Sequence, residues 1–172
     1  QDLLAHNSQM LIERQVEGII TIDTIIRFES DLPIVAVAGH ENISGVTNVI
    51  LDHQKAAELG IDHLYSLGHR KIAVIRGQEF SSDSKIRYDT IVAAAAKRGI
   101  IIDDNLTVQL EGINPSPEVG HTAANKLLAK NRDFTALFSF NDMSAIGAIR
   151  AFQEAGFRVP EDISVMGFDN IY

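Results

Sequence analysis

The stretches ALFSFND (136–142) and ISVMGFDN (163–170), near the carboxyl end of the chain, decide the fold. Each is an apolar, β-rich run, as expected of a strand buried on both faces, and each ends on an Asn/Asp pair. In a sheet of alternating strands and helices, ligands bind beyond the carboxyl ends of the strands. The first candidates for a ligand site are therefore the four residues that end these two runs: Asn141, Asp142, Asp169 and Asn170.

Similar runs recur along the rest of the chain and alternate with helical patterns. With the two above, strands are expected at 18–22, 33–38, 48–51, 71–75, 106–110, 136–140 and 163–168. Helices are expected at about 3–15, 53–67, 84–98, 117–130 and 143–155. Residues suited to helix ends agree with these bounds: Asp52, Ser82, Ser116 and Asn141 or Asp142 as N-caps, Pro117 at a first position, and Gly68, Gly99 and Gly156 after the last turns. The β-α-β-α order predicts an α/β fold with a parallel, doubly wound sheet.

The segment GHENISGVT (39–47) interrupts this alternation, because it is polar and rich in turn-forming residues. We therefore expect two lobes, with a boundary near Leu51 and Asp52, so that residues 1–51 form one lobe and 52–172 the other. Helical spacing starts at the first residues, and the chain stops just after a strand. These ends lead us to expect that the chain is a piece of a longer protein.

The composition is that of a globular protein and excludes several classes. The chain has 172 residues, of which 45% are hydrophobic and 22% charged, with a formal net charge of −8. Binding of nucleic acid by this segment itself is not expected, because phosphate binding needs clustered Lys and Arg. The absence of cysteine excludes disulfides, thiol catalysis and thiolate metal sites, and is in keeping with a cytoplasmic protein. No apolar run approaches the roughly 18 residues that span a bilayer, so no membrane association is expected.

Polar or flexible residues also follow the other predicted strands. They are Asp23, Gly39, His40, Asp52, Arg76 and Gly77. Together with Asn141 and Asp169 they would ring one crevice, whose rim is acidic and amide-rich and carries an arginine. Carboxylate, amide and guanidinium groups make paired hydrogen bonds to neighbouring hydroxyls or ring nitrogens. Such a crevice suits a neutral polyhydroxy or heterocyclic ligand.

Several of these candidates also have a purely structural interpretation. Asn141 or Asp142 taken alone could equally be only a cap of the following helix, although the same ending on two strands favours a site. Arg87, one turn into the helix that SSDSKIRYD (81–89) opens, could point back to the crevice. Spacing alone slightly favours a solvated surface arginine at this position.

Three phenylalanines near the strand ends could offer apolar faces to a ligand: Phe80, Phe140 and Phe168. Because Phe140 and Phe168 lie within predicted strands, core packing is their favoured interpretation. Phe80 lies in the loop after a strand and is the aromatic candidate for binding.

Catalysis is poorly supported, so no enzymatic activity, cofactor or metal is expected. The chain has no GxGxxG after a strand, no phosphate-binding lysine loop, no GxSxG and no HExxH. Its six histidines form no i, i+4 pair, and each is interpreted as a surface or capping residue. His69, in LGHRK just before a strand, is expected to serve the turn.

Three phrases of the sequence resemble one known family. They are RQVEGIITI (14–22), LYSLGHRKIAVIRG (64–77) and FSFNDMSAIGAIRAFQEAGFRVPEDISVMGFDNI (138–171). They resemble the effector-binding domain of the lactose and galactose repressor (LacI/GalR) family of bacterial transcription regulators. The resemblance implies a periplasmic-binding-protein-like fold of two Rossmann-like lobes with an effector in the cleft between them. It also implies a homodimer, and a separate N-terminal helix-turn-helix domain for operator DNA that is absent from this chain.

The resemblance also implies roles for individual residues. Arg87 matches an effector-binding arginine, Asn141 ends the strand before the AIGA helix, and Asp169 matches an acid that receives ligand hydroxyls or ring nitrogens. Asp52 matches a position at the lobe crossover. By the same match, residues 1–51 are the rear part of an incomplete N-terminal lobe, and the remainder is most of the C-terminal lobe.

Departures from the family pattern leave the ligand open. Thr90 replaces a glycine, Ile91 replaces an aromatic residue, and His53 stands where Asn is common. The segment TIIRFESDL (24–32) is also short for the family.

The leading functional hypothesis is a cytoplasmic transcriptional regulator whose lobes close on a small polar effector, such as a sugar or related metabolite. A periplasmic sugar-binding protein of a transport system is the main alternative. A small α/β hydrolase using Asp142 or Asp169, and a domain that recognises a partner protein, are the other two.

Overall fold

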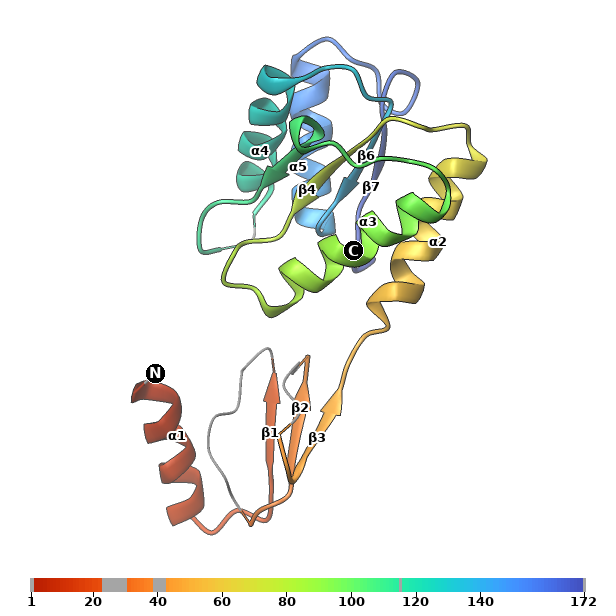
Figure 1. Cartoon of the computed structure of the whole chain (residues 1–172). Helices are drawn as coiled ribbons and strands as arrows, with labels where there is room; N and C mark the ends of the chain where they lie inside the picture. Colours follow the sequence, from red (N-terminus) through yellow and green to blue (C-terminus); the bar gives the residue numbers. More distant parts are fainter. Residues whose placement is uncertain (1, 23–30, 39–42, 115, 172) are drawn as a thin grey trace. The chain divides into compact units, whose positions relative to one another are not determined.

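A computed structural model describes residues 2–22, 31–38, 43–114 and 116–171. The chain divides into two compact units, Gln1–Leu51 and Asp52–Tyr172, each of which has its own sheet (Figure 1). Asp23, Gly39, His40 and most of the segment 24–32 lie outside the described residues.

The first unit is a three-stranded parallel sheet with one described helix. Its elements are α1 (Asp2–Glu13), β1 (Ile19–Ile22), β2 (Ile34–Val37) and β3 (Val46–Val49), with the strands in the order β1-β2-β3. The core is small, and its buried members are Ile19, Ile34 and Ala36, against which Leu11 of α1 packs.

The strand predicted at 48–51 is shifted in the structure. It runs from Val46 to Val49, because Val46 pairs with Ile34 of the neighbouring strand directly after the turn at Gly45, whose φ is +81°. The apolar residues Ile50 and Leu51 are 61% and 47% exposed, so their hydrophobicity does not reflect burial in this sheet.

The second unit is a four-stranded parallel sheet with the strand order β5-β4-β6-β7. Its strands are β4 (Ile72–Arg76), β5 (Thr107–Gln109), β6 (Ala136–Ser139) and β7 (Ser164–Met166). Its α-helices are α2 (His53–Ser66), α3 (Ser82–Lys97), α4 (Pro117–Lys130) and α5 (Asp142–Glu154), and a 3₁₀ turn, η1 (Asp104–Leu106), precedes β5.

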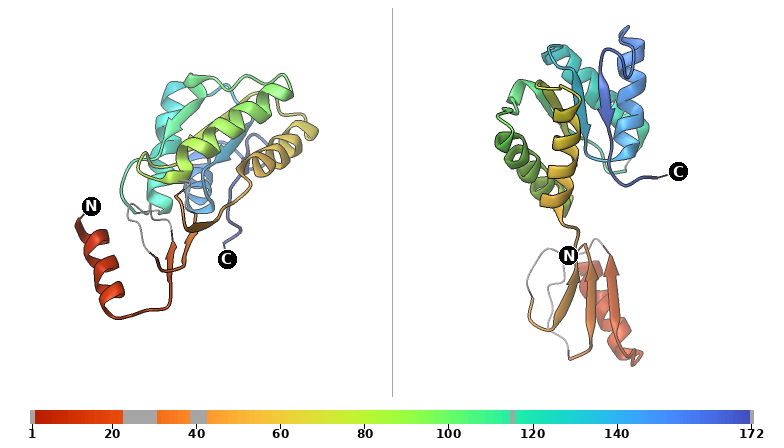
Figure 2. Two further views of the ribbon diagram at one scale, coloured as in Figure 1. Left: turned by 60° about the horizontal axis from the view of Figure 1, so that its bottom comes forward. Right: turned by 90° about the vertical axis from the view of Figure 1, so that its right-hand side faces the viewer.

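Both faces of this second sheet are covered by helices. Ile72 and Val74 of β4 point to a core shared with α2 and α3, whereas Ala73 and Ile75 point to a core shared with α4 and α5. The two helix pairs flank the sheet on opposite sides (Figure 2). The α/β class and the parallel, doubly wound arrangement are therefore confirmed.

The helix ends follow the predicted signals closely. The carboxylate of Asp52 accepts from the Lys55 N–H at 2.9 Å, and the hydroxyl of Ser116 accepts from the Val119 N–H at 3.4 Å. Ser82 was the wrong residue for the third cap, because the N-cap of α3 is Ser81, which makes no side-chain capping bond. Glycines with positive φ follow the helices as expected: Gly68, Gly99 and Gly156.

The sheet order creates a switch point between β4 and β6. From β4 the chain moves outward to β5, then crosses back to β6 on the other side of β4 and moves on to β7. The connections therefore leave the carboxyl ends of β4 and β6 in opposite directions, which opens a crevice in folds of this type. Within the described part of the chain, no helix is both long and apolar enough to cross a membrane.

Candidate functional site

Arg87 is held at the switch point by two hydrogen bonds. Its Nη1 donates to the carbonyl oxygen of Phe140 at 2.6 Å, directly after β6, and its Nη2 donates to Asp83 Oδ2 at 3.1 Å. The residue is only 6% exposed. The interpretation of Arg87 as a solvated surface arginine is therefore wrong, because α3 directs this side chain toward the strand ends.

Two aromatic rings flank the Arg87 guanidinium. Its carbon lies 4.4 Å from the centroid of the Phe140 ring and 3.9 Å from that of Phe168. Both rings are partly buried and pack against the cores on the two faces of the sheet. Core packing thus describes only part of their role, since they also hold the cation in place by cation–π contact.

Asp169 follows β7 and carries the second charge of the site. Burial raises the pKa of its carboxyl group, and the nearby Arg87 charge opposes that rise, whereas Asp142 and Asp83 add to it. For Arg87, burial lowers the pKa, and the charges of Asp83 and Asp169 counteract this. The two residues are therefore electrostatically coupled across the strand ends.

The backbone at Asp169 is strained. Asp169 has a φ of +107° and Asn170 a φ of +58°, which are conformations that residues with a Cβ rarely adopt. Strain of this kind clusters at functional sites, where the surrounding structure maintains it. Asp142 supplies part of that support, because its Oδ2 accepts from the Ile171 N–H at 2.9 Å and its own N–H donates to the Phe168 carbonyl.

Asn141 serves as a cap in the structure. Its Oδ1 accepts from the Ser144 N–H at 2.9 Å, and the Ser144 hydroxyl completes a capping box. The Ser144 hydroxyl also lies 2.8 Å from that of Ser139 in the buried end of β6. The capping interpretation is therefore confirmed for Asn141, and a role in binding stays a prediction.

Two members of this cluster were missed in the sequence: Asp83 and His53. Asp83 lies four residues before Arg87 on α3, and its Oδ1 is 3.6 Å from His53 Nε2. His53 is 4% exposed, so its interpretation as a surface or capping histidine is wrong. The i, i+4 spacing of Asp83 and Arg87 was a signal that could have indicated their pairing.

The other two predicted site residues are placed differently. Asp52 caps α2, one residue before His53. Phe80 is 70% exposed in the loop after β4. Their contact with a ligand stays a prediction.

The loop after β4 is fixed by bonds to a single carbonyl. The Gly77 oxygen accepts from the Ser84 hydroxyl at 2.7 Å and from the Gln109 side-chain amide. A Cβ at Gly77 would lie 2.5 Å from atoms of the Phe140 ring, so only glycine allows this close approach. The start of α3, and with it Arg87, is thereby positioned against the end of β6.

His69 does more than serve a turn. Its Nδ1 lies 2.9 Å from the Thr135 hydroxyl, and its Nε2 lies 3.1 Å from the Ser164 hydroxyl. His69 thus links the amino ends of β4, β6 and β7. These lie at the end of the sheet opposite the one that holds Arg87. Among the residues that the structure describes, no group of three or more His, Cys, Asp or Glu side chains could hold a metal.

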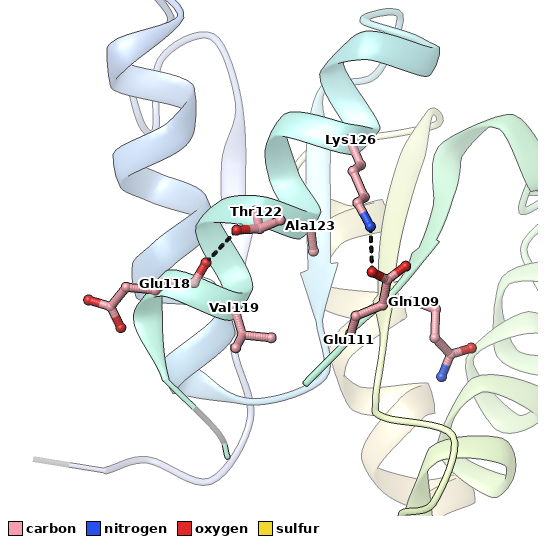
Figure 3. Close-up of a pocket in the computed structure, with 7 residues that line it drawn as sticks. All are labelled: Gln109, Glu111, Glu118, Val119, Thr122, Ala123 and Lys126. Atoms are coloured by element: carbon pink, nitrogen blue, oxygen red, sulfur yellow. Dashed lines mark hydrogen bonds and ion pairs between the residues drawn. The ribbon is translucent and has the colours of Figure 1, made fainter. Parts of the chain in front are cut away.

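A separate hollow of about 170 Å³ lies between α4 and the end of β5 (Figure 3). It is lined by Gln109, Glu111, Glu118, Val119, Thr122, Ala123 and Lys126. Lys126 Nζ pairs with Glu111 Oε2 at 2.6 Å, and both side chains are largely exposed. None of the predicted site residues lines this hollow, and its one lining lysine is already paired with Glu111.

The fold and the polar cluster at the switch point agree with a binding-protein-like class, and comparison with known proteins identifies the family. Residues 61–172 match the periplasmic binding protein-like domain. The chain therefore belongs to that family.

Similar proteins are transcriptional regulators. The chain is 35% identical over 180 residues to the HTH-type transcriptional repressor PurR of Pasteurella multocida, and 33% identical over 171 residues to the HTH-type transcriptional regulator DegA of Bacillus subtilis. These matches cover 98% and 94% of the chain but 52% and 50% of the relatives. The chain thus spans about half the length of these relatives.

Solved structures of LacI-type regulators share the fold. The Escherichia coli transcriptional repressor ascG has a TM-score of 0.80 at 29% identity, covering 95% of this chain and 61% of the repressor. The lac repressor dimer bound to operator and the anti-inducer ONPF has a TM-score of 0.81 at 25% identity, covering 95% and 58%. The predicted resemblance to the LacI/GalR family is confirmed, and its members are not enzymes.

Proposed function

We propose that this chain is the effector-binding and dimerisation domain of a bacterial LacI-type transcriptional regulator. One observation carries the proposal: a buried arginine, Arg87, is fixed by a strand-end carbonyl and two aromatic rings beside the strained acid Asp169. Such preorganised polar groups at a switch point are what a small-ligand site in this fold requires.

The effector is proposed to be a small polar molecule, such as a sugar or related metabolite, that lies between the two lobes. Asp169 would accept hydrogen bonds from ligand hydroxyls or ring N–H groups, and Phe140 and Phe168 offer apolar ring faces. Asp52, Phe80 and Asn141 are proposed as further contacts. Asn141 would contribute its amide N–H groups, because its side-chain oxygen is engaged in the cap.

Regulation would follow from lobe closure. An effector that contacts both lobes stabilises one relative orientation, and a homodimer transmits this change to DNA-binding domains. The shift is limited to the ligand's differential affinity for the two states, typically about 1–3 kcal/mol of coupling.

Operator DNA is proposed to bind through a separate N-terminal helix-turn-helix domain. With a net charge of −8, the chain itself is unsuited to phosphate contacts. A cytoplasmic location follows from this role. A periplasmic sugar-binding protein is not favoured, because the similar proteins are repressors and regulators.

The test is a thermal-shift screen of the regulator that carries this chain, against monosaccharides, disaccharides, nucleosides and sugar phosphates. A ligand at 100 times its Kd adds about 2.7 kcal/mol of stability. A ligand found in this way is expected to change operator binding in the wild type and to lose its effect in Asp169→Ala and Arg87→Ala. An unchanged response in both folded variants would disprove the site.

A further inference from the structure

We propose that Asp83 determines the charge class of the effector: it neutralises Arg87 inside the protein, so that the site accepts neutral or basic polar ligands and rejects phosphorylated or carboxylated ones. The inference rests on the proposed function and adds a residue and a ligand class to it.

The position of Asp83 makes it an internal counter-ion. It lies in the first turn of α3, and its two carboxylate oxygens face different groups: Oδ2 is 3.1 Å from Arg87 Nη2 and Oδ1 is 3.6 Å from His53 Nε2. The side chains of Arg87 and His53 are 8% and 3% exposed, whereas that of Asp83 is 21% exposed. The Asp83 carboxylate is therefore the more solvent-accessible partner of the buried Arg87 guanidinium.

Both terminal nitrogens of the Arg87 guanidinium are already engaged, whereas its buried Nε makes no hydrogen bond. Nη1 donates to the Phe140 carbonyl and Nη2 to Asp83, while the two rings cover the guanidinium within 4.4 Å. An arginine that recognises phosphate or carboxylate presents two parallel N–H groups to the anion. Any such pair at Arg87 includes Nη1 or Nη2, so an incoming anion would compete with the Phe140 carbonyl or the Asp83 carboxylate.

The surrounding charges oppose an anion as well. Burial raises the pKa of Asp169, the Arg87 charge lowers it, and the charges of Asp142 and Asp83 raise it further, so two carboxylates act on Asp169. An anionic ligand would add to this repulsion in a desolvated region, where charge interactions are stronger than in water. Hydroxyl, N–H and ammonium groups would instead donate to these carboxylates.

The probes are inorganic phosphate and two matched pairs of ligands, ribose with ribose 5-phosphate and adenosine with adenosine monophosphate. Binding to the regulator that carries this chain is measured by calorimetry at fixed ionic strength. The wild type is expected to bind the uncharged member of a pair at least about tenfold more tightly than its phosphate, a difference of about 1.4 kcal/mol. A wild type that prefers the phosphorylated member, or binds phosphate equally well, overturns the proposal without any variant.

Variants assign the effect to Asp83. Asp83→Asn and Asp83→Ser are expected to raise the affinity for inorganic phosphate at least about tenfold, with a steep dependence on salt, whereas Asp83→Glu retains the rejection. Asp89→Asn is the matched control, because it removes one negative charge from the exposed Lys85–Asp89 pair of the same helix. Unchanged phosphate affinity in folded Asp83→Asn and Asp83→Ser, or an equal gain in Asp89→Asn, overturns the assignment.

The two proposals fail in different ways. If Arg87→Ala and Asp169→Ala leave the binding of the uncharged ligand unchanged, the proposed site is wrong. If those variants abolish binding while Asp83→Asn leaves the discrimination against phosphate intact, only the role of Asp83 is wrong.

Discussion

The two sheets of this chain are both parallel and both built from apolar runs, but they differ in how their faces are covered. In the second unit, alternate residues of β4 pack against helices on both sides. In the first unit, Ile19 packs on the α1 side, whereas Ile20 and Ile22 are 73% and 72% exposed. An apolar strand face needs a second layer that covers it. Within the described residues, only the sheet of the second unit is covered on both faces.

The largest expected effect concerns folding of the units alone. Residues 52–172 produced as a fragment are expected to unfold in one cooperative transition, because two cores fill both faces of their sheet. Residues 1–51 alone are expected to lack such a transition, since a chain of this size buries too little surface. Circular dichroism during urea unfolding distinguishes the two, and a cooperative transition of 1–51 would contradict the comparison.

Core truncation measures the same difference at single residues. Phe152, with no exposure, contacts Phe134 at 5.7 Å between ring centroids. Phe152→Ala is expected to lower the free energy of unfolding by about 3–5 kcal/mol. Ile20→Ala, in the exposed face of the first sheet, should change it by less than about 0.5 kcal/mol. Denaturant titration of the whole chain gives both values, and similar losses would show that the Ile20 face is buried in solution.

Close helix packing predicts a smaller loss. A Cβ at Gly147 of α5 would lie 1.8 Å from the Pro117 carbonyl oxygen of α4. Gly147→Ala is therefore expected to cost about 1–3 kcal/mol, since the helices must separate. In the first unit, Gly18→Ala meets only Pro33 atoms, the nearest at 3.1 Å, and should cost less. Melting temperatures order the two variants, and the reverse order would refute the packing argument.

The pH dependence of stability should include a contribution from His69 in the second unit. Burial lowers the pKa of His69 from its ordinary value of 6.5, so the folded state binds fewer protons than the unfolded state below that pH. The contribution of His69 to the free energy of unfolding is then fully present above pH 6.5, and it is lost as the pH falls toward the folded-state pKa. His69→Gln is expected to flatten the stability profile in this window, and an unchanged slope would exclude His69 as its cause.

The smallest effect is expected at an exposed ion pair. The Arg158 side chain and N–H bond the Asp162 carboxylate and lower its pKa to about 2. Its stabilisation is present above pH 3.8 and is lost as the pH falls toward 2. Asp162→Asn should therefore change acid unfolding slightly and leave stability near neutral pH almost unaffected. NMR titration of the carboxyl group tests the pKa, and a value near 4 would contradict the pairing.

Much of the fold could be predicted because its signals are local. Apolar runs and capping residues located every strand and α-helix of the second unit to within three residues at each end, but not the 3₁₀ turn η1. Errors appeared where pairing with a neighbour decided the outcome, as at β3, whose register with β2 moved the strand toward Val46.

The site could be predicted less completely. Position after a strand was sufficient to single out Asp169, and the resemblance to a known family added Arg87. The i, i+4 spacing on α3 could have paired Asp83 with Arg87. Nothing local showed that His53 joins them, because His53 belongs to α2, which meets α3 only when both pack on one face of the sheet.

By itself, then, the sequence determined the α/β class, the order of the elements, most helix ends and the family, since all of these depend on residues close together in the chain. Tertiary structure decided which polar residues are buried and which groups they bond. It placed Arg87 between two rings and against the Phe140 carbonyl, left Asn141 as a cap, and brought His53 of α2 to Asp83 of α3. Burial and charge pairing depend on what surrounds a side chain in space, and spacing along one element does not specify that.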